Sequence, residues 1–147
     1  MYRASLFPSL GYNTVFLGGD EQVFNPELAA RTYGEDWLVR RTAEIRQPGR
    51  LLAFASARSR TGDQDPEPGY FAVNPPCLVG RRWAPAFDEA APPDTWGYVH
   101  PRWNGRAMAA FTDGHAASMT TGELQDMRHW ANPADRPDWS LRPLETR

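Results

Sequence analysis

Residues 105–120 read Gly-Arg-Ala-Met-Ala-Ala-Phe-Thr-Asp-Gly-His-Ala-Ala-Ser-Met-Thr, and this segment carries the strongest fold signal in the sequence. Two segments suited to β-strands, 105–112 and 115–120, flank the dipeptide Asp113-Gly114. An Asp-Gly pair between such segments predicts a β-hairpin with a two-residue type I′ loop, because both loop residues then need a positive φ. The sequence therefore predicts an antiparallel strand pair that turns at Asp113 and Gly114.

The two-residue loop also predicts which side chains share a face. In that register Phe111 faces Ala116 and Thr112 faces His115. We expect Phe111 to be the main core residue of the hairpin, on one face with Ala107 and Ala109. Thr120 and Ser118 lie across from these two alanines.

A helix is predicted directly after the hairpin. Thr120-Thr121-Gly122-Glu123 has the spacing of a capping box, in which the Thr120 hydroxyl and the Glu123 carboxylate each bond a backbone N–H. Apolar side chains follow at helical spacing, and Asn132-Pro133 ends the run. The tail 134–147 has no periodicity, so it is predicted to be irregular, either draped over the surface or disordered.

The remaining chain predicts short elements separated by long loops. Pro and Gly number 14 and 12 of 147 residues, above average usage, which favours a loop-rich domain. We expect one α+β domain over 1–147, built on an antiparallel sheet. Further expected elements are strands at 12–17, 50–57, 70–73 and 77–79, one helical turn at 27–30, a helix at 37–45, and loops at 58–69 and 85–94.

Composition excludes several classes of function. The formal net charge is −2 and the 16 basic residues, all Arg, are scattered, so no basic face is predicted to bind nucleic acid. The longest apolar run, Leu51 to Ala55, is far shorter than the roughly 20 residues of a membrane-spanning helix. The first residues show no signal-peptide pattern, and a lone Cys77 closes no intrachain disulfide.

Three segments resemble the prepilin-like proteins that carry the processing-associated H-x9-D-G domain. Tyr12-Asn13 followed by Leu17-Gly18-Gly19 is similar to the family's Tyr-Asn strand and Gly-Gly turn, and residues 45–54 are similar to its Ile-x-x-Pro segment with the apolar strand that follows. The most specific match is 102–115, Arg-Trp-Asn-Gly-Arg-Ala-Met-Ala-Ala-Phe-Thr-Asp-Gly-His. The family's histidine falls at Trp103, and His100 lies three residues earlier.

The resemblance implies a pilin-like globular head with a structural role. Proteins of this family begin with a leader, a processing site and an apolar helix, so this chain is expected to be a head without that helix. The implied function is that of a subunit of a type IV pilus-like or type II secretion pseudopilus-like filament. The implied partners are other copies of itself or related subunits, outside the cytoplasm at the cell envelope or surface, with membrane contact only through the missing helix.

Two sets of side chains are candidates for binding a metal. His100, Asp113 and His115, with Asn104, could converge across the hairpin, although Asp113 and Gly114 are also what a turn needs irrespective of any metal. Oxygen ligands in loops suit Ca²⁺, and the candidates are Asp20, Glu21, Asp63 and Asp65, of which the last two have no EF-hand spacing. No other cofactor is expected, and a metal-dependent hydrolase is the third hypothesis for function.

No nucleophile motif indicates an enzyme. Cys77 lies between Pro76 and Leu78 with no His or Lys nearby in sequence, which predicts a buried thiol. No serine lies in a Gly-x-Ser-x-Gly context, and no Cys-x-x-Cys or His-Glu-x-x-His occurs. We therefore expect a protein without catalytic residues.

Six tryptophans supply a different hypothesis. They are Trp37, Trp83, Trp96, Trp103, Trp130 and Trp139. Core packing is their default role, but several exposed indoles on one patch would indicate a carbohydrate- or protein-binding module at the cell surface. Trp103, just before the Asn104-Gly105 turn signal, is the candidate for a contact between subunits.

Overall fold

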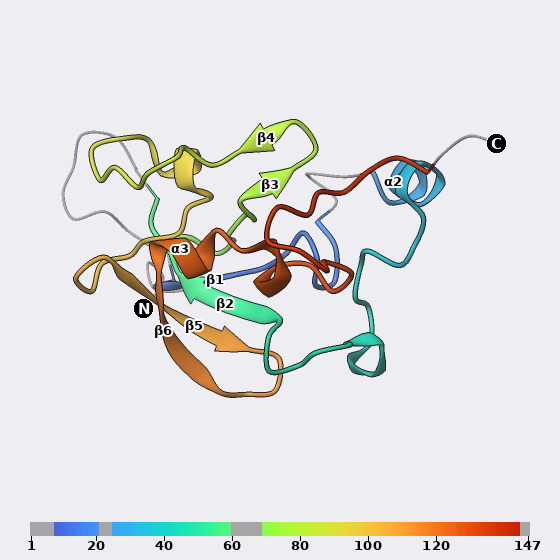
Figure 1. Cartoon of the computed structure of the whole chain (residues 1–147), viewed down its shortest axis with the longest axis horizontal. Helices are drawn as coiled ribbons and strands as arrows, with labels where there is room; N and C mark the ends of the chain where they lie inside the picture. The colour runs from blue at the N-terminus through green and yellow to red at the C-terminus, as the bar shows by residue number, and fades with distance from the viewer. Residues whose placement is uncertain (1–7, 21–24, 60–68, 145–147) are drawn as a thin grey trace.

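An antiparallel sheet of four strands in the order β1-β2-β5-β6 carries the structure (Figure 1). The computed structural model describes residues 8–20, 25–59 and 69–144. In this sheet the strands are β1 (Leu10–Tyr12), β2 (Leu52–Ser56), β5 (Arg106–Phe111) and β6 (Ala116–Thr120). Elsewhere in the described ranges are the β3 (Cys77–Leu78) and β4 (Arg81–Arg82) pair, the helices α2 (Pro26–Tyr33) and α3 (Thr121–Leu124), and the 3₁₀ turns η1 (Thr42–Glu44), η2 (Pro93–Trp96) and η3 (Met127–His129). The α+β class and the antiparallel sheet are confirmed.

The β5–β6 hairpin lies where the sequence predicts it, but its loop has three residues instead of two. The Phe111 N–H donates to the His115 carbonyl at 2.9 Å, and the Gly114 N–H donates to the Phe111 carbonyl at 2.9 Å. Among the loop residues 112–114, Gly114 alone has a positive φ, 92°. The predicted type I′ loop at Asp113-Gly114 is therefore wrong, and the observed loop is the three-residue kind in which one glycine takes the left-handed position.

The longer loop keeps the predicted face of β5 and reverses that of β6. Ala107, Ala109 and Phe111 are buried on the core side, as predicted. Across from Ala107 lies Met119, which is 4% exposed, whereas the prediction placed Thr120 there. A shift of one residue moves every side chain of a strand to its other face, so Ser118 lies outside.

A type I′ loop does occur in this region, at Asn104-Gly105. These residues have φ values of 53° and 73°. Trp103 and Arg106 flank them and exchange two backbone hydrogen bonds of 3.1 Å each. Asn-Gly is the pair best suited to this turn because both residues tolerate a positive φ. Since flanking residues of a two-residue loop share a face, Trp103 lies on the same side of the sheet as Arg106.

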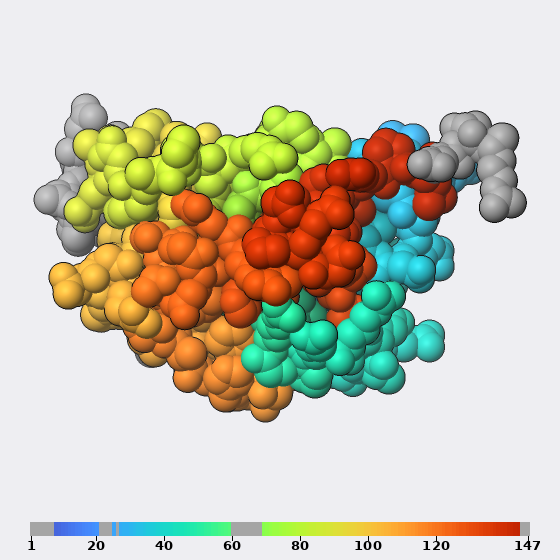
Figure 2. Space-filling model, viewed as in Figure 1, coloured from blue at the N-terminus to red at the C-terminus, as the bar shows by residue number. Residues whose placement is uncertain are grey.

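The C-terminal segment covers the core side of the sheet. Leu124, Met127 and Trp130 belong to one buried cluster with Ala107, Ala109 and Phe111 of β5. In Figure 1 α3 and the segment after it lie in front of β1 and β2, and the space-filling view shows the same orange to red segment over the middle of this face (Figure 2). The core therefore lies between the sheet and a segment that is mostly irregular.

The capping box forms as predicted, but the helix that it starts has only one turn. The Thr120 hydroxyl accepts from the Glu123 N–H at 3.2 Å, and the Glu123 carboxylate accepts from the Thr120 N–H at 2.7 Å. Continuation would require the Arg128 N–H to bond the Leu124 carbonyl. Instead Arg128 N–H donates to Asp126 Oδ1 at 2.9 Å, and the Trp130 indole N–H donates to the Leu124 carbonyl at 2.8 Å. These side-chain hydrogen bonds thus end α3 after one turn. The chain then forms the separate 3₁₀ turn η3.

Other predicted elements differ mainly in extent. The strand at 50–57 is confirmed as β2 and the strand at 77–79 as β3, while α2 is longer than the one turn predicted at 27–30. The strand predicted at 12–17 is wrong beyond Tyr12, where the chain turns, and that at 70–73 is reduced to one bridge at Ala72. The helix predicted at 37–45 is wrong except for η1.

The described part of the tail, 134–144, contains neither helix nor strand and lies against the rest of the chain. Leu141 is buried, and the Leu144 N–H donates to the Thr32 carbonyl at 2.7 Å. The draped arrangement is thus the observed one for these residues. The assignment of all 147 residues to one domain stays a prediction. None of the helices in the described ranges has the length and apolar character that a membrane crossing requires.

Asn13 joins the sheet to the C-terminal segment. Its side chain is fully buried, and its amide Nδ2 donates to the Leu52 carbonyl at 3.0 Å and to the Trp130 carbonyl at 2.9 Å. Its backbone N–H donates to the Ala53 carbonyl at 2.9 Å. One residue therefore satisfies three backbone carbonyls, two from adjacent residues of β2 and one from the C-terminal segment.

Replacing Asn13 by Ala is expected to lower the free energy of unfolding by about 2–4 kcal/mol, because two buried carbonyls lose their donor. The matched control is Asn132→Ala, since Asn132 also makes two side-chain hydrogen bonds, to the Arg46 N–H and the Glu44 carbonyl, but at the surface. We expect about 1 kcal/mol or less there because water replaces the lost partner. Urea unfolding of the two variants measures the difference, and equal losses would contradict the role given to burial.

Gly114→Ala is expected to destabilise the chain by roughly 1–2 kcal/mol, the usual cost of a side chain in the left-handed region. A Cβ at Gly114 meets nothing within 4 Å, so backbone strain is the whole effect. Gly122→Ala is the control, because its Cβ also meets nothing within 4 Å while its φ is not positive. Thermal unfolding that shows no loss for Gly114→Ala relative to Gly122→Ala would contradict the loop conformation.

Candidate functional site

The tip of the β5–β6 hairpin holds two of the predicted metal ligands and is fixed against the turn at 48–51. The Thr112 hydroxyl and the Asp113 N–H both donate to the Pro48 carbonyl, at 3.0 and 3.3 Å. The Thr112 N–H donates to the Leu51 carbonyl at 2.9 Å. The tip is thus anchored to a segment more than 60 residues earlier in sequence, as the sequence separation of 64 between Thr112 and Pro48 shows.

Asp113 and His115 form a pair on this tip. Asp113 Oδ1 accepts from the His115 N–H at 3.1 Å and lies 2.6 Å from His115 Nδ1. The His115 ring stacks on Phe111, with centroids 4.4 Å apart and planes 4° from parallel. Hydrogen bonds from the His115 backbone and then from its ring lower the pKa of Asp113. The carboxylate is therefore held ionised and bonded within its own turn, which is the arrangement of an Asx turn.

His100 does not join this pair. Its backbone N–H donates to the Ser56 carbonyl at 2.8 Å, at one end of β2, and its ring Nε2 lies 3.7 Å from a Glu89 carboxylate oxygen. The hairpin tip lies at the other end of β2, where Leu52 pairs with Phe111. Four residues of extended strand separate the two ends by about 13 Å. Asn104, in the loop before β5, is also distant from the tip.

The structure assembles no metal-binding group from the residues that it describes. Within 8–20, 25–59 and 69–144, no three His, Cys, Asp or Glu side chains are placed to hold an ion. Of the calcium candidates, Asp20 accepts a hydrogen bond from the Thr14 hydroxyl at 2.8 Å. Glu21, Asp63 and Asp65 lie outside the described residues, so calcium binding by these loops stays a prediction.

The tryptophans lie mostly in the interior. Trp96 and Trp130 are 1% and 0% exposed, and both contact Trp83, with ring centroids 4.3 and 5.6 Å from it. Trp103 is the exception with 47% exposure, and the Arg102 guanidinium lies 5.4 Å above its ring. The indoles thus gather in the core instead of on one solvent-facing patch. Cys77 is also buried, at the start of β3.

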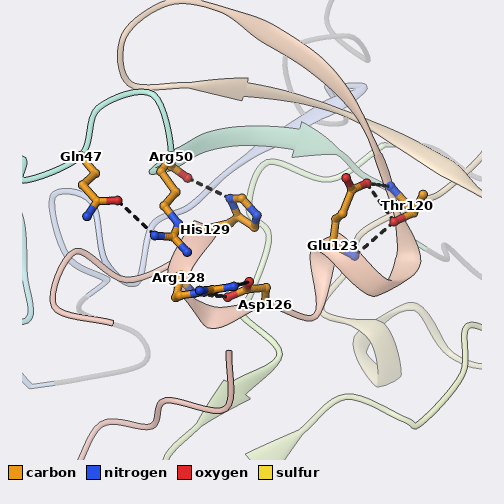
Figure 3. Close-up of polar contacts among 7 residues, drawn as sticks. All are labelled: Gln47, Arg50, Thr120, Glu123, Asp126, Arg128 and His129. Atoms are coloured by element: carbon orange, nitrogen blue, oxygen red, sulfur yellow. Dashed lines mark hydrogen bonds and ion pairs between the residues drawn. The ribbon is translucent and has the colours of Figure 1, made fainter. Parts of the chain in front are cut away.

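A second group of polar contacts lies around α3 and η3 (Figure 3). The Arg128 guanidinium binds both carboxylate oxygens of Asp126, at 2.6 to 3.0 Å. Burial acts to raise the pKa of Asp126, but the hydrogen bonds from Arg128 outweigh it and the pKa is lowered. His129 Nδ1 lies 3.1 Å from the Arg50 carbonyl, so this group ties the turn at 47–50 to the C-terminal segment. These contacts fix the path of the chain.

The sequence patterns do not predict the burial of two polar residues. They place Asn13 only in a strand and Arg58 in a polar loop. Arg58 is fully buried, and its guanidinium donates to the carbonyls of Glu89, Asp88 and Ala91 at 2.8 to 3.1 Å. Periodicity carries no signal for such residues, because their partners are backbone carbonyls about 30 to 117 positions away.

Comparisons with protein-family models, with curated proteins and with solved structures find no match to this chain. The resemblance to the H-x9-D-G prepilin-like proteins therefore rests on the residues quoted above alone. The features that bear on function are thus those of the chain itself: a hairpin with an anchored tip, an exposed Trp103, and a sheet covered on one face by the C-terminal segment.

The contribution of Asp113 to stability is expected to depend on pH. Because folding lowers the pKa of this carboxyl, its contribution is present above the pKa of the unfolded chain and is lost as the pH falls through the lower pKa of the folded chain. Asp113→Asn is expected to be less stable than the parent at neutral pH and to converge with it as the pH falls through the lowered pKa of Asp113 in the folded chain. Thermal unfolding at several pH values measures this, and a constant difference would contradict it.

Proposed function

We propose that this chain is the globular head of a structural subunit in a type IV pilus-like or type II secretion pseudopilus-like filament. The observation that carries the proposal is the segment 102–115, which resembles the prepilin-like family most specifically and which contributes β5 to the sheet. Its Asn104-Gly105 and Asp113-Gly114 pairs lie in the loops at the two ends of that strand. The residues that carry the resemblance therefore serve the architecture of the sheet.

The outer face of the sheet supports this role. By their register, Leu10, Tyr12, Phe54, Met108 and Ala110 share the face opposite to the main core, and Tyr12 also packs against a small buried cluster of Leu17, Val39 and Leu51. Leu10 and Phe54 are 43% and 40% exposed, and the Phe54 ring lies 5.0 Å from that of Tyr12. Large apolar side chains grouped on one face of a sheet favour contact with another apolar surface. In the proposed subunit, the apolar helix that precedes the head supplies the second apolar surface.

The proposal places the head outside the cytoplasm, among other copies of itself or related subunits. Trp103 fits a contact between such subunits, because it is exposed and exposed tryptophans are enriched in protein interfaces. The role is structural, so Asp113 and Gly114 act as turn residues and no residue is assigned to catalysis.

The test begins with the gene. We expect the codons upstream of Met1 to encode a processing site followed by about 20 apolar residues, the length of a membrane-spanning helix. A gene without them would overturn the proposal.

A second experiment uses the longer chain. Phe54→Asp is expected to abolish filaments seen by electron microscopy, because a charge on the outer sheet face repels an apolar helix. Leu28→Asp is the control, since Leu28 is 65% exposed on α2 and lies away from the sheet. Both head domains are first compared by thermal unfolding. Filaments that persist in Phe54→Asp would contradict the role of this face.

A further inference from the structure

β6 is an edge strand, so the N–H and C=O groups of successive residues point alternately toward β5 and away from the sheet. Phe111 bonds His115, so the hydrogen-bonded pairs along the hairpin continue through Ala109 with Ala117 and Ala107 with Met119. In an antiparallel ladder the intervening residues direct their N–H and C=O groups away from the partner strand. The backbone groups of Ala116, Ser118 and Thr120 therefore point away from β5, on the unpaired side of β6, which is the last strand of the sheet (Figure 1).

Two of these outward groups are covered by side chains. Arg106 reaches across from β5, where Nη2 donates to the Ser118 carbonyl at 2.7 Å and Nε donates to the Ser118 hydroxyl at 2.8 Å. The Glu123 carboxylate accepts from the Thr120 N–H at 2.7 Å, as Figure 3 shows. Arg106 Nη2 and Glu123 Oε2 are 3.9 Å apart. We call Arg106 and Glu123 the edge clasp.

The edge clasp protects a strand that has little other protection. Natural edge strands avoid pairing through charged residues, proline or bulges. β6 reads Ala-Ala-Ser-Met-Thr, it contains no charge or proline, and its pairing with β5 is regular over all five residues. Its outward side chains are small, so a second strand could approach closely.

A second copy of the same strand fits this edge in one register. If two β6 strands pair antiparallel about a two-fold axis at Ser118, Ser118 pairs with its own copy and Ala116 pairs with Thr120 of the other chain. All three residues direct their backbone groups outward, so these pairs are the hydrogen-bonded pairs of such a ladder, and Ala117 opposite Met119 of the other chain is the non-hydrogen-bonded pair between them. The central pair needs the Ser118 carbonyl, and the outer pairs need the Thr120 N–H.

We propose that the β6 edge is a latent self-association surface, which the edge clasp of Arg106 and Glu123 holds closed against a second copy of this chain. Arg106 donates to the Ser118 carbonyl that the central pair requires. Glu123 accepts from the Thr120 N–H that the outer pairs require. The two-fold axis also brings the Arg106 side chains of both copies to the same centre, where their like charges repel. Removing Arg106 therefore both frees the edge and removes the repulsion. This inference does not depend on the proposed filament role.

The test is sedimentation velocity of the purified chain over a range of concentrations. Arg106→Ala is expected to dimerise with an association constant at least about tenfold larger than that of the parent, equivalent to 1.4 kcal/mol. Arg106→Gln is made in parallel, so that a folding defect of one variant leaves the other to decide. Arg81→Ala is the control for loss of one positive charge, because Arg81 is exposed on the separate β3–β4 sheet.

A second substitution locates the contact. In Arg106→Ala with Ser118→Pro, proline removes the outward N–H of the central pair without removing a bond to β5. We expect this double variant to return to the self-association of the parent. If the Arg106 variants do not dimerise more strongly than the parent and Arg81→Ala, or if dimers persist with proline at position 118, the proposal is overturned.

Discussion

The hydrogen bonds of one buried amide, that of Asn13, hold the C-terminal segment on the sheet. Asn13 Nδ2 binds the carbonyls of Leu52 and Trp130, and the Asn13 N–H binds that of Ala53. The Asn13 side chain therefore connects the end of β1 with β2 and with the C-terminal segment. Its partners Leu52 and Trp130 lie 39 and 117 residues away in sequence. Each bond lies in the interior, where an unpaired carbonyl costs about 1–3 kcal/mol. Asn13 thus determines how the C-terminal segment lies over the sheet.

The same solution recurs wherever the chain lacks regular structure. Buried backbone carbonyls need donors, and a loop-rich chain supplies few from helices and strands. Side chains take their place: the indole N–H of Trp130 binds the Leu124 carbonyl, that of Trp96 binds the Ala84 carbonyl, and Arg58 binds three carbonyls of the 88–91 loop. The tryptophans therefore pack the core and also satisfy backbone groups, which accounts for their burial better than a binding surface does.

Short-range signals in the sequence were sufficient for the hairpin, the capping box and β2, because turn chemistry, caps and apolar runs act over a few residues. They were insufficient to predict where an element ends when a residue outside that element determines its end. The chain leaves the strand at Tyr12 because Asn13 turns inward, and α3 ends early because Asp126 and Trp130 take over its next hydrogen bonds. For the candidate site, the tip residues Asp113 and His115 are adjacent as expected, whereas the separation from His100 follows from the length of β2.

The loop at Asp113-Gly114 shows how burial can override a local turn preference. A two-residue loop would have placed Ser118 on the core face and Met119 in solvent. The three-residue loop buries Met119 to 4% exposure and leaves Ser118 outside, and full burial of a methionine side chain contributes about 1.5–3 kcal/mol. That gain favours the three-residue loop. The same shift pairs Ser118 with Met108 and places its side chain on the outer face of the sheet with Arg106, which binds both the hydroxyl and the carbonyl of Ser118. The packing of one methionine thus determines the core face of β6 and also which side chain of β6 lies beside Arg106.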